Sequence, residues 1–225
     1  MKLFEEDACP ETAIVTPVGA VFESFVRTMS ESSSDRPKHS AQAILVRAGS
    51  TAVVKVDKGA GNVVDALFAL ILAGCQEVHF VGLCGSLSEL LPIGSIVMPE
   101  VVLRLDHLSD SLGVPAAMDT RCFHDGICYP PAVALRDGSA TLRCSLATLS
   151  CLYEEAALIP GLCALGIDCI DLECGAVYAT AARLRLRCSA FLVVSDFAKE
   201  DSIFSLKTLP PGVLRAIDAV AAQLL

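Results

Sequence analysis

The feature that most constrains the fold of this chain is a repeated alternation between short, β-branched apolar runs and segments with helical periodicity. Buried strands that alternate with amphipathic helices are typical of α/β proteins, in which helices cover a mostly parallel sheet. The sequence therefore predicts a three-layer α/β/α sandwich with a mostly parallel mixed sheet. The length of 225 residues fits one domain better than two, so we expect a single domain over residues 1–225.

The predicted elements follow one another in a regular order. Apolar periodicity places strands at 12–17, 43–47, 52–57, 78–81, 95–98, 168–172 and 190–195. Helices are expected at 21–29, 63–73, 152–165 and 174–186, and Pro210-Pro211 opens a terminal helix that reaches Leu225. The serine-rich residues 30–40 are expected to form an exposed loop, and residues 106–131 a long irregular segment.

Charge and hydropathy exclude two classes of protein. The formal net charge of −9 at pH 7 argues against non-specific nucleic-acid binding, which needs a basic surface. Bilayer-spanning helices need roughly 18–20 apolar residues, and the longest apolar candidate, 63–75, is already interrupted by Asp65. The acidic start of the chain does not have the pattern of a secretory signal. We therefore expect neither a nucleic-acid nor a membrane partner.

The cysteines and histidines indicate no metal and no cofactor. The 11 cysteines include no C-x-x-C pair, so no zinc ribbon is expected. The four histidines are dispersed, and none has the spacing of a metal ligand. Most cysteines stand in apolar segments, where a reduced thiol behaves as a small hydrophobic group. This usage favours the reducing cytoplasm as the location of the protein.

Two glycine-containing segments come after predicted strands. The glycines Gly59, Gly61 and Gly82 are candidates for a loop that brings backbone N–H groups to an anion or ligand. For the first segment, a tight turn onto a buried helix is the simpler alternative. In the second segment Cys84 suggests a nucleophile, but no residue nearby in the sequence would activate its thiol. We therefore do not expect Cys84 to be a catalytic nucleophile.

Carboxylates follow two of the predicted strands directly, in Asp171-Leu172-Glu173 and in Ser195-Asp196. The carboxyl ends of parallel strands meet at one edge of the sheet, where ligands bind. Acids at this edge are placed for hydrogen bonding to a ligand or for proton transfer. The alternative is that Glu173 and Asp196 only cap the segments that follow them.

Together these strand ends resemble those of the nucleoside phosphorylase and nucleosidase superfamily, which includes purine nucleoside phosphorylase, uridine phosphorylase and methylthioadenosine nucleosidase. Residues 78–99 resemble the family's block of strand, glycine loop and strand. Residues 171–182 resemble its Met-Glu helix, with Leu172 in place of methionine, and residues 191–196 its apolar strand that ends in Ser-Asp. The resemblance implies a nucleoside phosphorylase-like fold and cleavage of the bond between ribose C1′ and the base.

The resemblance also implies roles for particular residues. Glu173 would hold the ribose hydroxyls and stabilise positive charge on the sugar, and Asp196 would be the general acid toward the leaving base. A pocket for sugar and base would be formed by Leu83, Cys84, Gly85, Asp171, Leu172, Ser195 and Phe197. Family members complete their sites with a neighbouring subunit, which implies a homodimer or a hexamer.

The chain departs from the family at three places. The phosphate-binding arginine and hydroxyl of the phosphorylases correspond to Phe80 and Leu83 here. The water-activating glutamate of the nucleosidases has Glu23 as its nearest candidate, with an ordinary surface glutamate as the alternative. The purine-stacking aromatic corresponds to Ala147, which leaves Phe123, Tyr129 or Phe197 as candidates for stacking.

Three hypotheses follow from these departures. The first is a nucleosidase, active on a purine nucleoside in purine salvage, that transfers the ribosyl group to water. The second is a nucleoside phosphorylase with a rebuilt phosphate site, and the third is a family member that binds a nucleoside without turnover. Base release without phosphate, base release only with phosphate, and no release distinguish the three.

Overall fold

The computed structural model describes residues 10–30, 38–39, 43–106, 117–119, 141–198 and 208–225. Its strands are β1 (Thr12–Thr16), β2 (Lys38–His39), β3 (Ala43–Ala48), β4 (Thr51–Val56), β5 (Glu77–Ser86), β6 (Ile96–Arg104), β7 (Ala117–Asp119), β8 (Leu142–Thr148), β9 (Cys169–Asp171) and β10 (Arg187–Phe197). Its helices are α1 (Gly19–Ser30), α2 (Ala60–Leu72), α3 (Glu155–Ala164), α4 (Cys174–Leu184) and α5 (Pro211–Leu224), and the 3-10 turn η3 (Leu152–Glu154) precedes α3.

The strands form one mixed sheet in the order β10-β6-β8-β9-β5-β1-β4-β3-β2, with β7 added to β6. The longest pairing is parallel and joins β5 to β10. Because β10 also pairs with β6, and β9 also pairs with β5, the strands β5, β10, β6, β8 and β9 close into a ring. We call these five strands the β-ring. The expected mixed sheet is thus confirmed, and about half of it curls upon itself.

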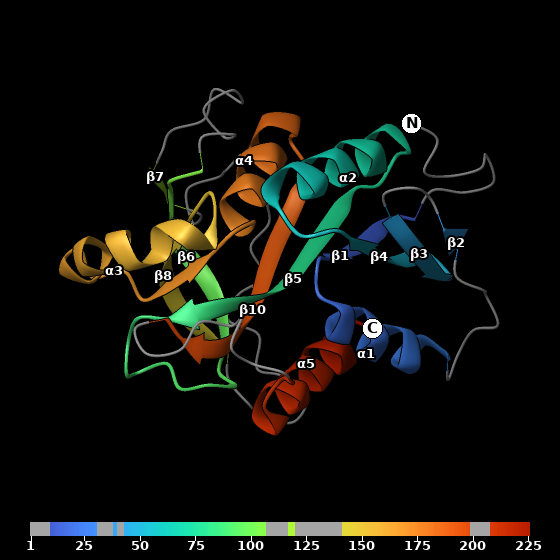
Figure 1. Ribbon diagram of the computed structural model, residues 1–225. Helices are drawn as coiled ribbons and strands as arrows, with labels where there is room; N and C mark the ends of the chain where they lie inside the picture. The colour runs from blue at the N-terminus through green and yellow to red at the C-terminus, as the bar shows by residue number, and fades with distance from the viewer. Residues whose placement is uncertain (1–9, 31–37, 40–42, 107–116, 120–140, 199–207) are drawn as a thin grey trace.

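Helices cover both faces of the sheet, as a three-layer sandwich requires (Figure 1). The helices α2 and α4 pack against each other on one face, and α1 and α5 pack against each other on the other. Each pair buries its own apolar cluster, with Leu67 and Tyr178 in the first and Phe25 and Ile217 in the second. These side chains are almost fully buried, and burial of apolar side chains is the main favourable contribution to folding.

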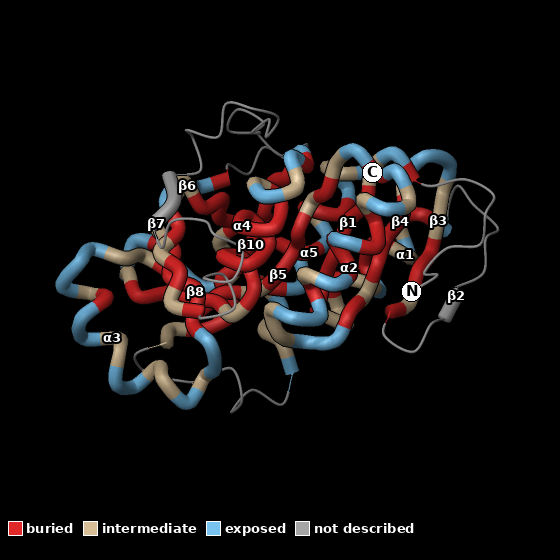
Figure 2. The backbone as a smooth tube through the Cα atoms, turned by 90° about the horizontal axis from the view of Figure 1, so that it is seen from above, coloured by how far each residue is buried: buried red, intermediate tan, exposed pale blue. Residues whose placement is uncertain are grey.

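Burial is concentrated in the strands and in the inner faces of these four helices (Figure 2). Helix α3 differs, because most of its residues are exposed or only half buried. It lies at the end of the molecule that the β-ring forms (Figure 1). Its first residue lines the cavity of the candidate active site. Within the described ranges, no helix is long and apolar enough to cross a membrane.

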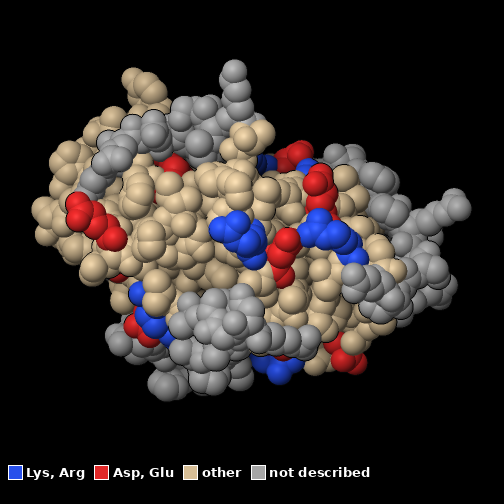
Figure 3. Space-filling view, turned by 90° about the horizontal axis from the view of Figure 1, so that it is seen from below, with Lys and Arg blue, Asp and Glu red and all other residues tan. Residues whose placement is uncertain are grey.

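Charged side chains of both signs occur on the face of the molecule seen from below. Figure 3 shows a face on which acidic and basic groups are scattered among neutral atoms, with no extended patch of one sign among the described residues. Nucleic-acid binding relies on a continuous basic surface. Among its described residues, this face therefore has no continuous basic surface for a nucleic acid.

The sequence placed most elements correctly, but it gave no range for β8 and shortened β5, β6 and β10. Strand β5 continues through Ser86, and β6 continues through Arg104. The partner strand β10 keeps β5 in register as far as Ser86, so Gly82 and Gly85 belong to a strand. The prediction that they lie in a loop was wrong, because inter-strand hydrogen bonds outside the local sequence hold the backbone extended.

Two segments predicted to be irregular fall mostly outside the described residues. In the serine-rich segment, Ser30 ends α1 and residues 38–39 form β2, which pairs with β3. In the long segment 106–131, residues 117–119 form β7, which pairs with β6. Short strands therefore occur where the composition predicted only loop.

Substitution of Gly82 tests how tightly the side chains of β5 and β10 are packed. A Cβ at this position would lie 2.9 Å from Phe80 Cε1 and 3.1 Å from Leu192 Cδ2. We expect Gly82→Ala to lower the free energy of unfolding by about 1–3 kcal/mol, as overpacking of a core does. Gly61→Ala is the control, since a Cβ there meets open space on α2. Equal stability of the two variants in denaturant titrations would contradict this packing.

Candidate active site

A cavity of about 510 Å³ opens at the carboxyl ends of β1, β4, β5, β9 and β10. This is the edge of an α/β sheet at which ligands bind. The turn η3 and the first residue of α3 form the remaining wall. The cavity is lined by Pro17, Val18, Lys58, Gly59, Leu83, Cys84, Gly85, Ser150, Cys151, Leu152, Tyr153, Glu155, Ile170, Asp171, Leu172, Glu173, Ser195 and Asp196.

Asp196 reaches the cavity through an irregularity in β10. Val194 pairs with Cys84 and Asp196 pairs with Gly85, so Ser195 is an extra residue without a partner on β5. Such a β-bulge bends the strand and re-aims a side chain, and bulges are common beside active sites. Asp196 Oδ2 lies 3.6 Å from the position that a Cβ of Gly85 would occupy. A Cβ here would be in ordinary van der Waals contact with the carboxyl group, and its nearest neighbour would be the Cβ of Ala198 at 3.0 Å.

The hydroxyl of Ser195 connects Asp196 to the backbone of β5. Its Oγ lies 2.5 Å from Asp196 Oδ1 and 3.2 Å from the carbonyl oxygen of Cys84. Ser195 and Asp196 are both buried. These contacts hold the carboxyl group of Asp196 against the wall of the cavity.

Glu173 is held at the start of α4 by a backbone group from the opposite wall. The N–H of Gly59 donates a hydrogen bond to Glu173 Oε1 at 2.9 Å. Burial raises the pKa of Glu173, while this hydrogen bond and the charge of Lys58 act in the opposite direction. The side chain of Glu173 caps no backbone group of its own helix, so the alternative that it is only a helix cap was wrong.

Gly59 can direct its N–H toward Glu173 because glycine adopts a backbone conformation that is unfavourable for other residues. Its φ of 109° and ψ of 142° lie in a region that side chains with a Cβ rarely adopt. This conformation turns the chain from β4 into α2 along the cavity wall. The predicted role of Gly59 in a backbone loop therefore corresponds to one specific hydrogen bond, made to a carboxylate of the protein.

Asp171 caps α4 in place of Glu173. Its carboxyl oxygens accept hydrogen bonds from the N–H groups of Glu173 at 3.2 Å and Cys174 at 2.6 Å, and from Thr148 Oγ1 at 2.6 Å. Burial, followed by the charge of Glu173, raises the pKa of Asp171 to about 7. Asp171 lines the cavity, but its hydrogen bonds are used within the protein and fix the direction in which Glu173 leaves the strand.

Thr148, at the end of β8, completes this cap. Besides donating to Asp171, its hydroxyl accepts a hydrogen bond from the N–H of Gly175 at 2.8 Å. A Cβ on Gly175 would lie 2.9 Å from Thr148 Oγ1, so only glycine allows this approach. The sequence analysis did not single out Thr148, because nothing in the local sequence shows that β8 ends beside α4.

Three further residues of the cavity were missed by the sequence analysis. Glu155 begins α3, and its pKa is raised by burial and then by the charge of Asp196. Lys58 is an exposed cation beside Gly59. Tyr153 is an aromatic side chain at the cavity with 94% of its surface exposed. A glutamate at a helix start and an exposed tyrosine are common in proteins, so their sequence carried no distinguishing signal.

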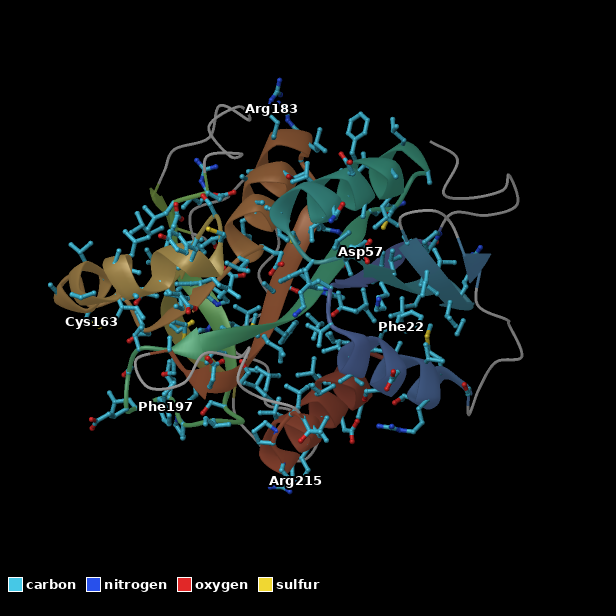
Figure 4. The ribbon with its side chains drawn as sticks, viewed as in Figure 1. Phe22, Asp57, Cys163, Arg183, Phe197 and Arg215 are labelled. Atoms are coloured by element: carbon cyan, nitrogen blue, oxygen red, sulfur yellow. The ribbon has the colours of Figure 1, made fainter. Side chains whose placement is uncertain are left out.

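Several predicted residues lie outside the cavity lining. Glu23 is exposed on α1, Gly61 lies in the first turn of α2, and Gly82 lies within β5. Phe197 ends β10 and is half buried (Figure 4). The other stacking candidates, Phe123 and Tyr129, are outside the described residues. The structure thus assembles Glu173, Asp196 and the strand ends but not these residues.

The cavity is acidic. Among the described residues that line it, Glu155, Asp171, Glu173 and Asp196 carry carboxyl groups, whereas Lys58 is the single cation. The described parts of the chain contain no cluster of His, Cys, Asp and Glu side chains that could hold a metal ion. The described polar side chains that line this site are the four carboxyl groups, the hydroxyl groups of Ser150, Tyr153 and Ser195, and the ammonium group of Lys58.

The relationship of this chain to known proteins follows from its match to a protein family. The sequence pattern of the phosphorylase superfamily matches residues 11–208, which include every residue that lines the cavity. The chain belongs to the phosphorylase superfamily. The resemblance seen in the strand ends is thereby confirmed, and the superfamily consists of enzymes. No curated protein matches the sequence as a relative.

Solved structures share this superfamily fold over nearly the whole chain. A 5′-methylthioadenosine/S-adenosyl homocysteine nucleosidase from Helicobacter pylori is 13% identical, with a TM-score of 0.74 and 97% of each chain covered. A futalosine hydrolase from Helicobacter pylori is 13% identical, with a TM-score of 0.69 over 95% of this chain and 94% of the other. A uridine phosphorylase from Vibrio fischeri is 14% identical, with a TM-score of 0.73 over 97% and 92%. At such identities the likeness shows the fold alone.

The burial of Asp171, followed by the charge of Glu173, makes stability depend on pH. Its pKa of about 7 in the folded protein exceeds the usual value of about 3.9 for an unfolded aspartate. The stabilising contribution of the protonated group is therefore complete below about pH 4 and is lost as pH rises through about 7. We expect the unfolding free energy of the unsubstituted protein, relative to Asp171→Asn, to fall between pH 4 and 7 by more than about 1.4 kcal/mol, the equivalent of one pKa unit.

Denaturant titrations across this pH range measure that difference. Asp65→Asn removes an exposed carboxylate from α2 and is the matched control. If the pH dependence of Asp171→Asn equals that of Asp65→Asn, Asp171 does not carry the raised pKa.

Gly59 provides a second test of the site. Gly59→Ala forces a Cβ into an unfavourable conformation, and we expect it to cost about 1–3 kcal/mol of stability. Loss of the hydrogen bond from residue 59 should also raise the pKa of Glu173, measured by carboxyl-carbon NMR titration. Gly61→Ala, two residues away, should leave that pKa unchanged. An unchanged Glu173 titration in Gly59→Ala would show that the backbone bond does not act on the carboxylate.

Proposed function

We propose that this protein cleaves the N-glycosidic bond of a nucleoside and transfers the ribosyl group to water. The observation that carries the proposal is the meeting of Glu173 and Asp196 in one cavity at the carboxyl edge of the sheet. Membership of the phosphorylase superfamily supports the reaction type. A nucleosidase and a futalosine hydrolase are among the proteins that share the fold, which is consistent with water as the acceptor.

The two acids would act at opposite ends of the scissile bond. The Glu173 carboxylate would accept hydrogen bonds from the ribose hydroxyls and stabilise the positive charge that develops on the sugar. Asp196 would give its proton to a ring nitrogen of the base, while the electron pair of the C1′–N bond passes to the base. The water oxygen bonds to C1′ and releases one proton to solvent, which restores the proton taken from Asp196.

The charge of the cavity favours water over phosphate as the acceptor. A buried phosphate dianion needs charge-assisted donors to offset the loss of hydration. The described cavity residues supply four carboxyl groups but one exposed lysine. Within this lining, no arginine stands ready to compensate a phosphate group. A neutral nucleophile avoids the resulting repulsion.

We further propose a purine as the base. The 5′-methylthioadenosine/S-adenosyl homocysteine nucleosidase that shares the fold supports this choice, and purine ring nitrogens can accept a proton from Asp196. Tyr153, exposed at the cavity, is an aromatic surface available for stacking. A cytoplasmic homodimer or hexamer, and a role in purine salvage, remain expectations from the sequence.

Release of free base from a panel of purine and pyrimidine nucleosides, with and without phosphate, tests this function. We expect release of a purine base in phosphate-free buffer. Asp196→Asn should lower turnover by about 10²–10⁴-fold, because an amide cannot supply the proton. Asp65→Asn should retain the unsubstituted rate.

Other outcomes would overturn parts of the proposal. Release only in the presence of phosphate would identify a phosphorylase, and no release from any nucleoside would indicate a binding protein. Turnover by Asp196→Asn at nearly the unsubstituted rate would remove Asp196 from the role of general acid.

A further inference from the structure

The hydroxyl of Thr148 joins the end of a strand to the start of a helix. Thr148 is the last residue of β8, and it pairs with Asp171 at the end of β9. Its Oγ1 donates a hydrogen bond to Asp171 Oδ1 at 2.6 Å and accepts one from the N–H of Gly175 at 2.8 Å. The side chain is fully buried and lies outside the lining of the cavity. The bonds of Thr148 are therefore made to the protein itself and not to a ligand.

Asp171 uses its two carboxyl oxygens for two different anchors. Oδ1 accepts the hydrogen bond from Thr148, whereas Oδ2 accepts from the N–H groups of Glu173 at 3.2 Å and Cys174 at 2.6 Å. Aspartate side chains form tight turns through such bonds to backbone N–H groups a few residues further on. Glu173 stands inside this turn, directly before the first residue of α4. The turn therefore sets the direction in which the side chain of Glu173 leaves the backbone.

The carboxyl group of Glu173 is held at its far end by a different part of the chain. Its Oε1 accepts a 2.9 Å hydrogen bond from the N–H of Gly59, directly before α2. A carboxylate has about four acceptor positions, so this bond leaves Glu173 with further capacity to accept hydrogen bonds. Glu173 lines the cavity. A ligand can use the remaining capacity only while the turn keeps Glu173 in its present direction.

We propose that Thr148 is a positioning residue for ribose recognition: its hydroxyl anchors Asp171, and Asp171 holds Glu173 toward the sugar hydroxyls. The proposal rests on the proposed function, in which Glu173 accepts hydrogen bonds from ribose. Valine has nearly the shape of threonine but neither donates nor accepts, so Thr148→Val would remove the bonds to Asp171 Oδ1 and to the N–H of Gly175. Asp171 then loses one of its two anchors, and the turn that directs Glu173 loosens.

The preference of the protein for ribose over a sugar without hydroxyl groups tests this role. The probes are adenosine and 2′,3′-dideoxyadenosine, compared by kcat/KM for release of adenine. In Thr148→Val we expect the preference for adenosine to fall by about 10–100-fold, the equivalent of one hydrogen bond to a charged group. Both probes meet the same folded molecules, so a smaller fraction of folded protein leaves this ratio unchanged.

Thr180→Val is the matched control. Thr180 is a buried threonine of α4 whose hydroxyl has no hydrogen-bond partner among the described residues, so this variant should keep the ribose preference. Thr148→Ser keeps a hydroxyl group at position 148 and should retain most of the preference. If Thr148→Val does not fold, Thr148→Cys replaces it with the same expected direction, because a thiol donates and accepts only weakly. A ribose preference that is the same in the variant at position 148 and in Thr180→Val would overturn the proposal.

Hydrogen exchange of the Gly59 N–H reports the direction of Glu173 without any substrate and separates this proposal from the proposed function. The bond to Glu173 Oε1 protects this N–H, so its exchange should be about tenfold faster in Thr148→Val than in Thr180→Val. The N–H of Ala73, bonded within the C-terminal end of α2, is the internal reference and should not change. If Gly59 exchange becomes faster but the unsubstituted protein releases no base, the positioning of Glu173 stands and the proposed reaction fails. If base is released and Gly59 exchange is unchanged, the reaction stands and the role of Thr148 fails.

Discussion

The parallel pairing of β5 with β10 is the interaction on which the rest of this structure depends. It closes the β-ring and runs from Arg187 beside Glu77 to Phe197 beside Ser86, while β5 also pairs with β1 and so joins the ring to the open part of the sheet. The bulge at Ser195 interrupts this pairing at the carboxyl edge and delivers Asp196 to the cavity. One pairing therefore both closes the β-ring and places an acid, since the regular strands hold the bulged residue in position.

The second constraint is the start of α4, where buried acids stand close together. Burying carboxyl groups is unfavourable unless hydrogen bonds compensate for lost hydration. Asp171 receives three hydrogen bonds from Thr148, Glu173 and Cys174, and Glu173 receives one from Gly59. The hydrogen bonds of Asp171 are therefore made to groups of the protein itself, whereas Glu173 is directed into the cavity. This arrangement links the end of β8, the β4–α2 turn and the first turn of α4.

The two constraints place acidic side chains of one cavity in different surroundings. The charge of Lys58 acts on Glu173, whereas the charge of Asp196 acts on Glu155. The two glutamates therefore experience different electrostatic potentials within one cavity. Enzymes obtain acid and base roles from chemically identical side chains by placing them in such different environments. Among its described residues, the lining also has one cation, Lys58, against four carboxyl groups. Both observations support the ribosyl transfer to water that we propose.

The sequence by itself determined the alternation of strands and helices, the family, and the acids at the carboxyl ends of β9 and β10, because these depend on local periodicity and on residues at strand ends. It did not determine that Gly82 lies within a strand, that Asp171 caps the helix, or that Ser195 forms a bulge, since these depend on β10 and β8 as neighbours. Nor did it single out Glu155, or show that Glu23 lies outside the cavity lining. Tertiary structure decided these points, because which side chains share one electrostatic environment is set by segments far apart in the chain.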